Sequence, residues 1–540
     1  MKKSKWFKSI AIPAVMAVAL VGCASEPDEG GDTGTDGGDG GADNGEEAEG
    51  EEGGNLVIAL GADIVALDPH GSNDVPSSNV QTNIYETLLT QSEDMELEPL
   101  LATDWEAVED DLWEFELRED VTFHDGSEFN AEVVKANFDR VLDPEVASPR
   151  QFLFEMIEEV IIVDDYTVQF KTEYPFAPLP SHLAHTGGSM ISKDAIDADY
   201  EAMEDGESPG SVLNSEPAGT GFFKFESRDT GNEVVLAKNE DYWGENAKVD
   251  QVTFRVISEP STRVGNLETG DIHISYPVEP NNKSRVEAMD IADVYEQRSL
   301  STAYVGFNND KEPFDDPKVR QALTMAIDKS AIIDGILEGN ATEAIAPIND
   351  QVFGFSDSVD ELGYDPERAK ELLAEAGYED GFETTIWTNE SAEREDIAII
   401  VQDQLSEIGV DVSIEVLEWG AYLDNTANGQ HDMFILGWVT VTGDADYGMF
   451  PLFHSSQKGA AGNRTFTDNA ELDDVLDQAR RETDDATRED LYEQALEILV
   501  EDAPMLSLYH TTYLVGVNKD VQGFWKHPNG LYMLQDVTIN

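Results

Sequence analysis

Cys23 is the only cysteine in this chain of 540 residues. A single cysteine cannot form an internal disulfide or a metal site with several cysteine ligands, so no such cross-link can hold the fold together. Residues 55–540 are long enough to form two or three domains around a sizeable hydrophobic core. The sequence therefore predicts a multidomain fold that depends on the packing of its core.

The residues before Cys23 have the pattern of a bacterial lipoprotein signal peptide. Lysines between positions 2 and 8 form a basic segment, and the apolar run Ile10–Gly22 is too short to span a bilayer comfortably. The run ends in Leu-Val-Gly-Cys, which resembles a lipobox. We expect residues 1–22 to be a signal peptide and Cys23 to carry a lipid that anchors the chain to the outer face of the cell membrane. The alternative is a plain secretory signal with an incidental cysteine.

Residues 23–54 are expected to form a tether between this lipid and the folded body. The segment after Cys23 is rich in Gly, Asp and Glu and contains no Lys or Arg. Such a segment cannot bury enough apolar surface to offset the entropy lost on ordering, and its like charges keep it extended. Its Asp-Gly repeats lack the spacing and the closing Glu of an EF-hand, so a calcium site is not expected.

The formal net charge of the chain is −79, from 112 acidic and 33 basic residues. The acids are spread along the whole sequence. This distribution favours a solvated acidic surface, of the kind adapted to high salt, over a site for one cationic partner. A nucleic-acid partner is excluded, because its phosphates would be repelled.

Strand and helix patterns alternate irregularly along the body of the chain. Apolar residues recur at every second position from Trp113, Tyr166, Val252 and Val412, which predicts strands. Asp-Pro pairs at 316–317 and 365–366 predict helix starts, with Asp as the cap and Pro in the first turn. Residues 471–502 have the pattern of two amphipathic helices separated near 483–484. The sequence predicts a mixed α/β fold with more than one sheet.

Common enzyme motifs are absent from the sequence. There is no Gly-x-Ser-x-Gly, no His-Glu-x-x-His, no phosphate-binding loop and no Gly-x-Gly-x-x-Gly. The nine histidines are scattered, and His182 and His185 lie in a proline-rich segment. We expect no catalytic residue, no cofactor and no metal site. A secreted hydrolase stays open as an alternative, because pairs of carboxylates can be drawn anywhere in so acidic a chain.

The segment 434–447 is the strongest candidate for a ligand site. An apolar strand ends near Trp438, and the polar loop that follows carries Asp444 and Asp446. A carboxylate just beyond a buried strand suits an α-ammonium group, and the rings of Trp438 and Tyr447 would add cation–π attraction. A capped turn with surface aspartates explains the same pattern, and chemistry alone leaves the two readings equal.

A series of motifs in a fixed order covers most of the chain. They are Ala62–His70, Tyr85–Leu89, Trp113–Arg118, Phe123–Gly126, Phe129–Lys135, Gly219–Lys224, Asn239–Gly244, Val319–Leu323 and Ala326–Lys329. Together they resemble family 5 of the extracellular solute-binding proteins of ABC importers, over essentially all of residues 55–540. The Thr442–Asp446 loop is most similar to the glutathione-binding branch of that family.

The resemblance implies a two-lobed α/β fold like that of periplasmic binding proteins of type II. The large peptide-binding class of this fold has an extra inserted domain and a hinge of two crossovers. Lobe I is then expected at residues 55–88, 214–302 and 513–540, the small inserted domain at 89–213 and lobe II at 303–512. A ligand would lie between the lobes as an extended strand, in pockets partly filled by water.

The resemblance also implies roles for single residues. Gly437 and Trp438 match the Gly-Trp pair that flanks the ligand backbone, and Asp444 matches the acid that holds its α-ammonium group. Trp419 matches a residue that lines the pocket, and Tyr422 lies one helical turn further along.

A ligand carboxylate has no obvious partner under this resemblance. Some oligopeptide-binding relatives carry Arg at the positions that align with Thr426 and Ile435. Arg394 and Arg464 are the substitutes that we consider, and the alternative for both is an ordinary surface ion pair.

The predicted function is that of a substrate-binding lipoprotein, which captures short peptides and delivers them to the permease of an ABC importer. We expect a monomer that catalyses no reaction. The alternatives are the same role for glutathione, a nickel chelate, a sugar or a peptide signal, a secreted hydrolase, and an adhesion or sensory protein without an importer.

Overall fold

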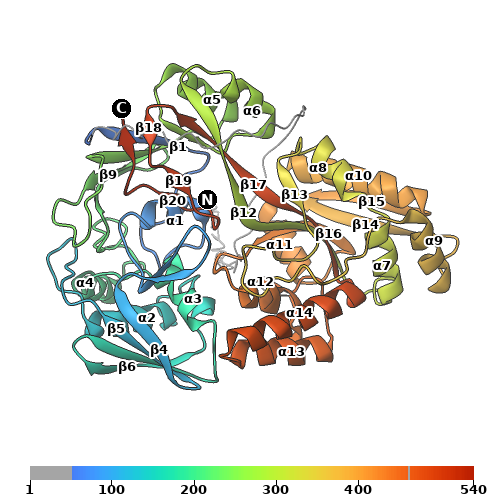
Figure 1. The fold of residues 1–540 in the computed structure, drawn as a ribbon, viewed down its shortest axis with the longest axis horizontal. Coiled ribbons are helices and arrows are strands. Elements are labelled where there is room, and N and C mark those ends of the chain that lie inside the picture. The colour runs from blue at the N-terminus through green and yellow to red at the C-terminus, as the bar shows by residue number, and fades with distance from the viewer. Residues whose placement is uncertain (1–51, 460–461) are drawn as a thin grey trace, which may run out of the picture.

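One mixed sheet of eleven strands runs through the molecule (Figure 1). The computed structural model describes residues 52–459 and 462–540. The strand order is β15-β14-β16-β12-β17-β11-β1-β10-β9-β8, and β13 also pairs with β17. These strands are β1 (Asn55–Leu60), β8 (Phe223–Asp229), β9 (Glu233–Lys238), β10 (Gln251–Val256), β11 (Ile274–Tyr276), β12 (Ala292–Phe307), β13 (Ala341–Glu343), β14 (Phe382–Asn389), β15 (Val410–Leu417), β16 (Met433–Val439) and β17 (Met505–Asn518).

Two long antiparallel strands join the two halves of this sheet. β12 has 16 residues and β17 has 14. β17 pairs with β11 at Gly516 and Val517, whereas β12 pairs with β16 over 301–307. The register of the two strands shifts between Arg298 and Thr302, and an irregularity of this kind bends a strand pair and increases its twist. Figure 1 shows β12 and β17 crossing from one half of the molecule to the other.

Helices accompany the half of the sheet that contains β14, β15 and β16. They are α7 (Pro317–Met325), α8 (Lys329–Gly335), α9 (Pro366–Glu375), α10 (Ala392–Glu407), α11 (Trp419–Ala427), α12 (Ala445–Phe453), the short η3 (Ser455–Gln457), α13 (Ala470–Arg481) and α14 (Asp485–Asp502). Both Asp-Pro predictions are confirmed, because Asp316 and Asp365 accept hydrogen bonds from first-turn amides of α7 and α9. The pair of helices predicted within 471–502 is confirmed as α13 and α14.

A four-stranded antiparallel sheet, in the order β4-β5-β7-β6, lies in the other half of the molecule (Figure 1). Its strands are β4 (Ala102–Glu109), β5 (Leu112–Leu117), β6 (Ile157–Asp164) and β7 (Thr167–Thr172). Around it lie β2 (Leu89–Gln91), β3 (Leu97–Pro99), α2 (Ala131–Leu142), η1 (Gln151–Leu153), α3 (Leu179–Leu183), η2 (Thr186–Gly188) and α4 (Lys193–Glu204). The alternation predicted near Trp113 and Tyr166 is confirmed, since Phe115 and Phe170 are buried and meet edge to face at 5.4 Å.

The remaining elements belong to the half that contains β1. They are α1 (Val75–Gln81), α5 (Pro260–Thr269), α6 (Pro280–Glu287), β18 (Val521–Gln522), β19 (Trp525–Lys526), β20 (Tyr532–Met533) and β21 (Thr538–Ile539). β19 and β20 form a hairpin, and the amide of Leu300 on β12 donates to the Pro528 carbonyl of its turn at 3.1 Å. The end of the chain therefore contacts β12 at the place where its register shifts.

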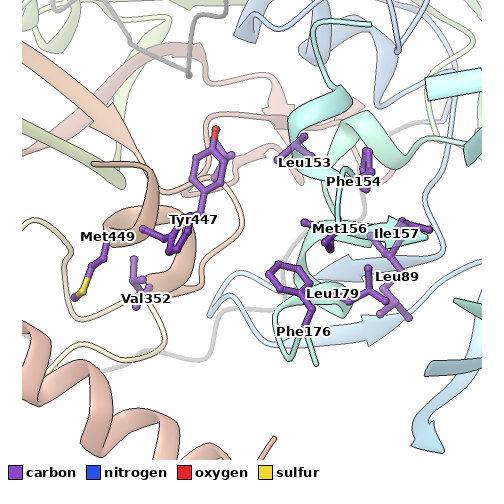
Figure 2. Close-up of a cluster of buried hydrophobic side chains, with 14 of the residues drawn as sticks. Leu89, Leu153, Phe154, Met156, Ile157, Phe176, Leu179, Val352, Tyr447 and Met449 are labelled. Atoms are coloured by element: carbon purple, nitrogen blue, oxygen red, sulfur yellow. The ribbon is translucent and has the colours of Figure 1, made fainter. Parts of the chain in front are cut away.

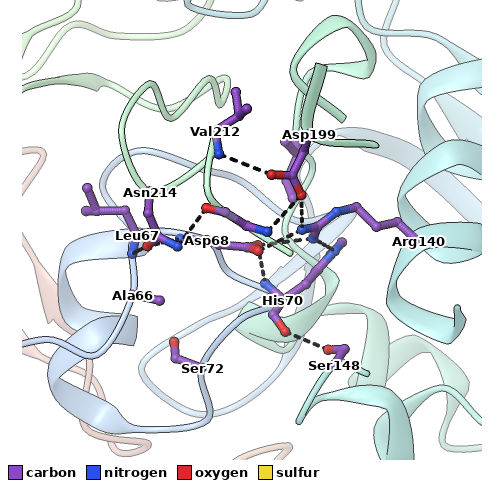
Figure 3. A network of polar contacts seen from close by, with 12 residues as sticks. Ala66, Leu67, Asp68, His70, Ser72, Arg140, Ser148, Asp199, Val212 and Asn214 are labelled. Carbon is purple, nitrogen blue, oxygen red and sulfur yellow. Dashed lines mark hydrogen bonds and ion pairs between the residues drawn. The ribbon is translucent and has the colours of Figure 1, made fainter. Parts of the chain in front are cut away.

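A buried ionic network fastens α2 and α4 to the loop after β1 (Figure 3). The guanidinium of Arg140 contacts the carboxylates of Asp68 at 2.8 Å and Asp199 at 3.0 Å, and all three side chains are almost fully buried. Arg140 also lies 3.0 Å from Nδ1 of His70. Burial and the nearby arginines lower the pKa of His70 well below its usual value, so its imidazole stays neutral and can accept this hydrogen bond. Segment 89–213 is thus joined to the loop after β1 by buried charges.

The same segment meets α12 mainly through apolar side chains. Leu153, Phe176 and Leu179 lie on one side and Tyr447 and Met449 on the other, in one cluster of buried residues (Figure 2). Apolar contacts of this kind are not directional and need no exact alignment of donors and acceptors.

The signal peptide, Cys23 and most of the tether lie outside the described residues. Within 52–459 and 462–540, no helix is both long and apolar enough to cross a membrane. The division of the body into lobe I, an inserted domain and lobe II stays a prediction. Its proposed boundaries at 302/303 and 512/513 fall inside β12 and β17.

Candidate binding site

The carboxyl ends of parallel strands meet near the middle of the large sheet. β1 runs parallel to β10 and β11 in one half, and β14 runs parallel to β15 and β16 in the other. Open α/β sheets bind ligands in the crevice outside such strand ends. A ligand site is therefore expected where β11 ends at Tyr276 and where β16 ends at Val439.

A pocket lies at this place and is lined by residues from both halves. We call it the central pocket. Its walls come from several elements. They include Tyr276 and Pro277 at the end of β11, Glu393 and Arg394 at the start of α10, Gly437 on β16, Ser301 and Ala303 on β12, and Tyr509 and Tyr513 on β17. The two strands that connect the halves of the sheet are thus part of its lining.

Arg394 enters the central pocket from the first turn of α10. Ser391 caps this helix, which places Arg394 just beyond the carboxyl end of β14, and the side chain is 1% exposed. Its Nη1 donates to Oδ1 of Asn389 at 2.6 Å, and its guanidinium lies 5.7 Å from the ring of Trp419. Trp419 in turn stacks on Tyr422 with ring centroids 6.0 Å apart. The structure therefore brings three of the predicted residues, Arg394, Trp419 and Tyr422, together.

Two further groups of the central pocket could not be singled out from the sequence. The hydroxyl of Tyr509 donates to Oε1 of Glu393 at 2.6 Å, and burial raises the pKa of this tyrosine well above its usual value. Tyr276 and Tyr513 face each other edge to face at 6.0 Å. These residues come from distant parts of the chain. No local pattern in the sequence distinguishes these tyrosines from the others in the chain.

Arg464 does not line the central pocket. It is 4% exposed, and its Nη1 donates to the carbonyl of Leu423 at 3.3 Å. Burial lowers its pKa, with the hydroxyls of Tyr304 and Tyr422 nearby. Tyr422 donates from its hydroxyl to the carbonyl of Ile435 at 2.6 Å. Arg464 and Tyr422 therefore support β16 from within the fold.

Asp444 caps α12 and forms a buried ion pair. Its carboxylate accepts from the amide of Asp446 at 2.9 Å, and each of its oxygens lies 3.0 Å from Nη2 of Arg488. The side chains of Asp444 and Arg488 are only 8% and 5% exposed. A ligand ammonium at Asp444 would have to share a carboxylate that already has a cationic partner.

The contact between α12 and segment 89–213 contains three further predicted residues, Asp446, Tyr447 and Trp438. We call this region, together with Asp444 and its partner Arg488, the α12 junction. Oδ1 of Asp446 lies 2.9 Å from Nε of Arg480, and its Oδ2 lies 3.9 Å from Nε2 of His182. Nε1 of Trp438 donates to the carbonyl of Tyr447 at 2.9 Å. The predicted ligand residues thus fall into two groups, one at or beside the central pocket and one at this junction, while Arg464 belongs to neither. Their roles stay predictions.

Comparison with known proteins identifies the family. The model of the bacterial extracellular solute-binding proteins, family 5, matches residues 96–460. This chain belongs to that family. The expected family and its two-lobed type II α/β fold are therefore confirmed. Members of the family are solute-binding proteins, so the central pocket is described from here on as a candidate site for a solute.

Named relatives align with almost the whole of this solute-binding protein. The glutathione-binding protein GsiB of Pectobacterium atrosepticum is 34% identical, over 90% of this chain and 94% of that protein. The periplasmic binding protein DppA of Helicobacter pylori, solved with the peptide STSA, has a TM-score of 0.78 at 33% identity, over 91% of this chain and 98% of that chain. The dipeptide-binding protein of Pseudoalteromonas sp. SM9913, solved with Met-Leu, has a TM-score of 0.78 at 26% identity, over 90% of this chain and all of that chain.

Proposed function

We propose that this family 5 protein is the substrate-binding lipoprotein of an ABC importer and that it captures short peptides in the central pocket. The observation that carries this proposal is a pocket whose walls come from the carboxyl ends of strands in both halves of the sheet. The relatives solved with the peptides STSA and Met-Leu support it.

The mechanism follows from a site shared by two bodies. A ligand that touches residues of both halves stabilises the arrangement in which those halves are close, and so shifts the population toward the closed state. β12 and β17 are the connections about which the proposed lobes would rotate, and their register shift lies at the proposed boundary. The closed protein then delivers its ligand to the permease, and no bond in the ligand is broken.

Segment 89–213 is proposed to move together with lobe I. Arg140 joins it to Asp68 through a fully buried ion pair. The contact with α12 and the loop before it combines apolar side chains with single polar contacts, from His182 to Asp446 and from Gln91 to the Thr442 carbonyl. It lacks a fully buried ion pair like that of Arg140, so we propose that it separates on opening.

Arg394 is the proposed partner of a ligand carboxylate, because it lines the central pocket and presents donors in a planar fork. Gly437, which also lines the pocket, leaves room for a ligand backbone next to β16. Trp419 would support the guanidinium from behind. Asp444 is the proposed partner of an α-ammonium group, which would share this carboxylate with Arg488.

The setting of the protein is proposed from the sequence. Cys23 would carry the lipid, and residues 23–54 would hold the binding body away from the membrane and near its permease. The net charge of −79 would keep a monomer soluble at high salt.

Glutathione is the second candidate ligand. The observation in its favour is that relatives from Pectobacterium atrosepticum and Escherichia coli, each aligned over 90% of this chain, are named glutathione-binding proteins. Glutathione is itself a peptide with free carboxylates, so both candidates place an anionic group in the same pocket.

A thermal-unfolding screen tests the proposal. The purified protein is unfolded and refolded to remove bound ligand and is then measured in high salt with di-, tri- and pentapeptides, their N-acetylated forms, glutathione, nickel and sugars. A ligand at 100 times its dissociation constant adds about 2.7 kcal/mol to the free energy of unfolding. Stabilisation by peptides supports the proposal. A response to glutathione alone selects the second candidate, and a response to nickel or sugars alone contradicts both.

A further inference from the structure

Lys526 is a fully buried lysine next to the central pocket. It lies on β19 of the C-terminal hairpin and is 0% exposed. Its ammonium lies 4.1, 4.8 and 4.4 Å from the ring centroids of Tyr276, Tyr513 and Tyr532, and it donates to the carbonyl of Gly530. Three aromatic faces thus form a cage around one cation.

The cage contains no carboxylate among the residues that the structure describes. Burial is the only cause that shifts the pKa of Lys526, which it lowers well below the usual value of a lysine. Lys329, by contrast, is a buried lysine that has both a carboxylate and a carbonyl as partners. Its Nζ lies 2.5 Å from Oε2 of Glu361 and 2.7 Å from the carbonyl of Ala344. Lys526 has the carbonyl contact but lacks the carboxylate.

Two rings of the cage are also walls of the central pocket. Tyr276 and Tyr513 line that pocket, and Arg394 lines it as well, from the half that contains α10. A group bound in the pocket would therefore lie between the guanidinium of Arg394 and the tyrosine rings in front of Lys526. This place combines the two cations with one carboxylate, that of Glu393, which also lines the pocket and accepts a hydrogen bond from the hydroxyl of Tyr509.

A buried lysine without a counterion is costly for a fold, because it either carries an uncompensated charge or gives up its proton at a lowered pKa. Taking a charged group out of water is unfavourable unless an opposite charge compensates it, and apolar replacements at such positions are often neutral or stabilising. Stability alone would favour a residue such as Met at position 526. A ligand carboxylate in the central pocket would supply the missing negative charge. Lys526 would therefore lower the stability of the ligand-free protein and stabilise the complex with the ligand.

We propose that Lys526 is a positioning residue that favours ligands with a carboxylate in the central pocket. Arg394 contacts the carboxylate directly, and Lys526 acts on it through the rings of Tyr276 and Tyr513. This inference rests on the proposed function, because it concerns the same pocket. It narrows the ligand class to anionic peptides or peptides with a free C-terminal carboxylate. It also gives the C-terminal hairpin a role in recognition without contact to the ligand.

The test compares each ligand with a version that lacks the charge. Affinities are measured by calorimetry for Met-Leu and Ser-Thr-Ser-Ala as free acids and as C-terminal amides, and for glutathione and its monoethyl ester. The wild-type protein is expected to prefer the free acids. Lys526→Met is expected to reduce that preference by about tenfold, since the variant loses one cationic group beside the pocket. The variant is also expected to melt at the wild-type temperature or above it.

Two lysine variants serve as controls. Lys329→Met removes a buried lysine away from the central pocket and is expected to lower the melting temperature, because Glu361 loses its partner, while the acid-to-amide ratio stays at the wild-type value. Lys370→Met removes an exposed lysine and controls for the change in net charge. The ratio of two affinities on one variant is independent of the fraction of protein that is folded.

The outcomes separate the inference from the function on which it rests. An unchanged acid-to-amide ratio in Lys526→Met, with wild-type binding intact, overturns the role of Lys526 and leaves the proposed function standing. Failure of the wild-type protein to bind any of the probes contradicts the proposed function itself. If Lys526→Met and Lys526→Gln both fail to fold, Lys526 serves the fold and the inference is wrong.

Discussion

The α12 junction and the central pocket differ in whether their buried charged residues have partners of opposite charge within the chain. At the junction, Asp444 pairs with Arg488 and Asp446 pairs with Arg480, so the acids have cationic partners within the chain. At the central pocket, Lys526 is buried against tyrosine rings with no carboxylate partner among the described residues. A charge that is paired within the protein supports its fold. A buried lysine without a counterion lowers stability, and in the proposed role of Lys526 a ligand carboxylate supplies that counterion.

This difference changes how the predicted ligand residues should be weighed. The sequence made Asp444 the strongest candidate, because an acid in a loop after an apolar strand suits an ammonium group. The structure gives that acid a buried arginine at 3.0 Å. Arg394, which the sequence offered only as a substitute, lines the pocket that both halves share. The most informative experiments are therefore those that separate these two regions.

The largest expected effect is on stability and comes from Arg488→Met. Removal of one partner leaves the buried carboxylate of Asp444 uncompensated, which costs about 3–5 kcal/mol of the free energy of unfolding. Urea denaturation measures this loss. A variant with wild-type stability would show that Asp444 does not depend on Arg488 and would restore it as a free partner for a ligand ammonium.

Asp444→Ala completes this comparison at the same junction. The family resemblance predicts that the variant loses free-amine peptides while its open fold survives. The ion pair predicts instead a loss of stability of the size seen for Arg488→Met. Calorimetry with free and N-acetylated peptides, next to urea denaturation, distinguishes the two. Unchanged affinity for free-amine peptides would contradict the assignment of Asp444 to the ligand.

An intermediate effect is expected for Arg394→Gln at the central pocket. A hydrogen bond to a charged group contributes about 1.5–3 kcal/mol, so the affinity for a free-acid peptide should fall by roughly 10- to 100-fold. The affinity for the C-terminal amide should change little, because the lost interaction is specific to the carboxylate. Equal losses for acid and amide would mean that Arg394 supports the pocket through Trp419 and Asn389 and does not bind the ligand.

The smallest expected effect concerns pH and the strand pair beside the pocket. His510 on β17 lies 3.0 Å from Oγ1 of Thr302, and burial lowers its pKa to about 4. The unfolded chain takes up this proton near pH 6.5, so the contribution of neutral His510 is complete above that pH. It is lost as the pH falls toward 4, by at most about 1.4 kcal/mol per pH unit.

His510→Gln isolates this contribution. Its unfolding free energy should fall less steeply between pH 6.5 and 4 than that of the wild-type protein. His124 and His527 also have pKa values lowered to about 4 by burial, so some acid sensitivity remains in the variant. Identical slopes for variant and wild type would show that His510 is not neutral in the folded protein.

Local features of the fold were predictable from the sequence, because their causes are local. Asp316 and Asp365 cap helices through amides only a few residues away, and alternation near Phe115 reflects one buried face of a strand. The single helix expected from 317 onward is two helices in the structure. The first ends at Met325, and a new helix begins after Asp328, whose carboxylate accepts a capping hydrogen bond from the amide of Ala331.

The sequence by itself determined the family, the mixed α/β class and the exclusion of a disulfide-held fold, because ordered motifs, periodicity and the cysteine count are properties of the chain. Only the tertiary structure decided which charges have partners. Asp444 and Arg488 are 44 residues apart, and Lys526 meets Tyr276 across half of the chain. Electrostatic energy depends on the distances between charges and on their burial, and both are properties of the folded structure that the order of residues in the sequence does not contain.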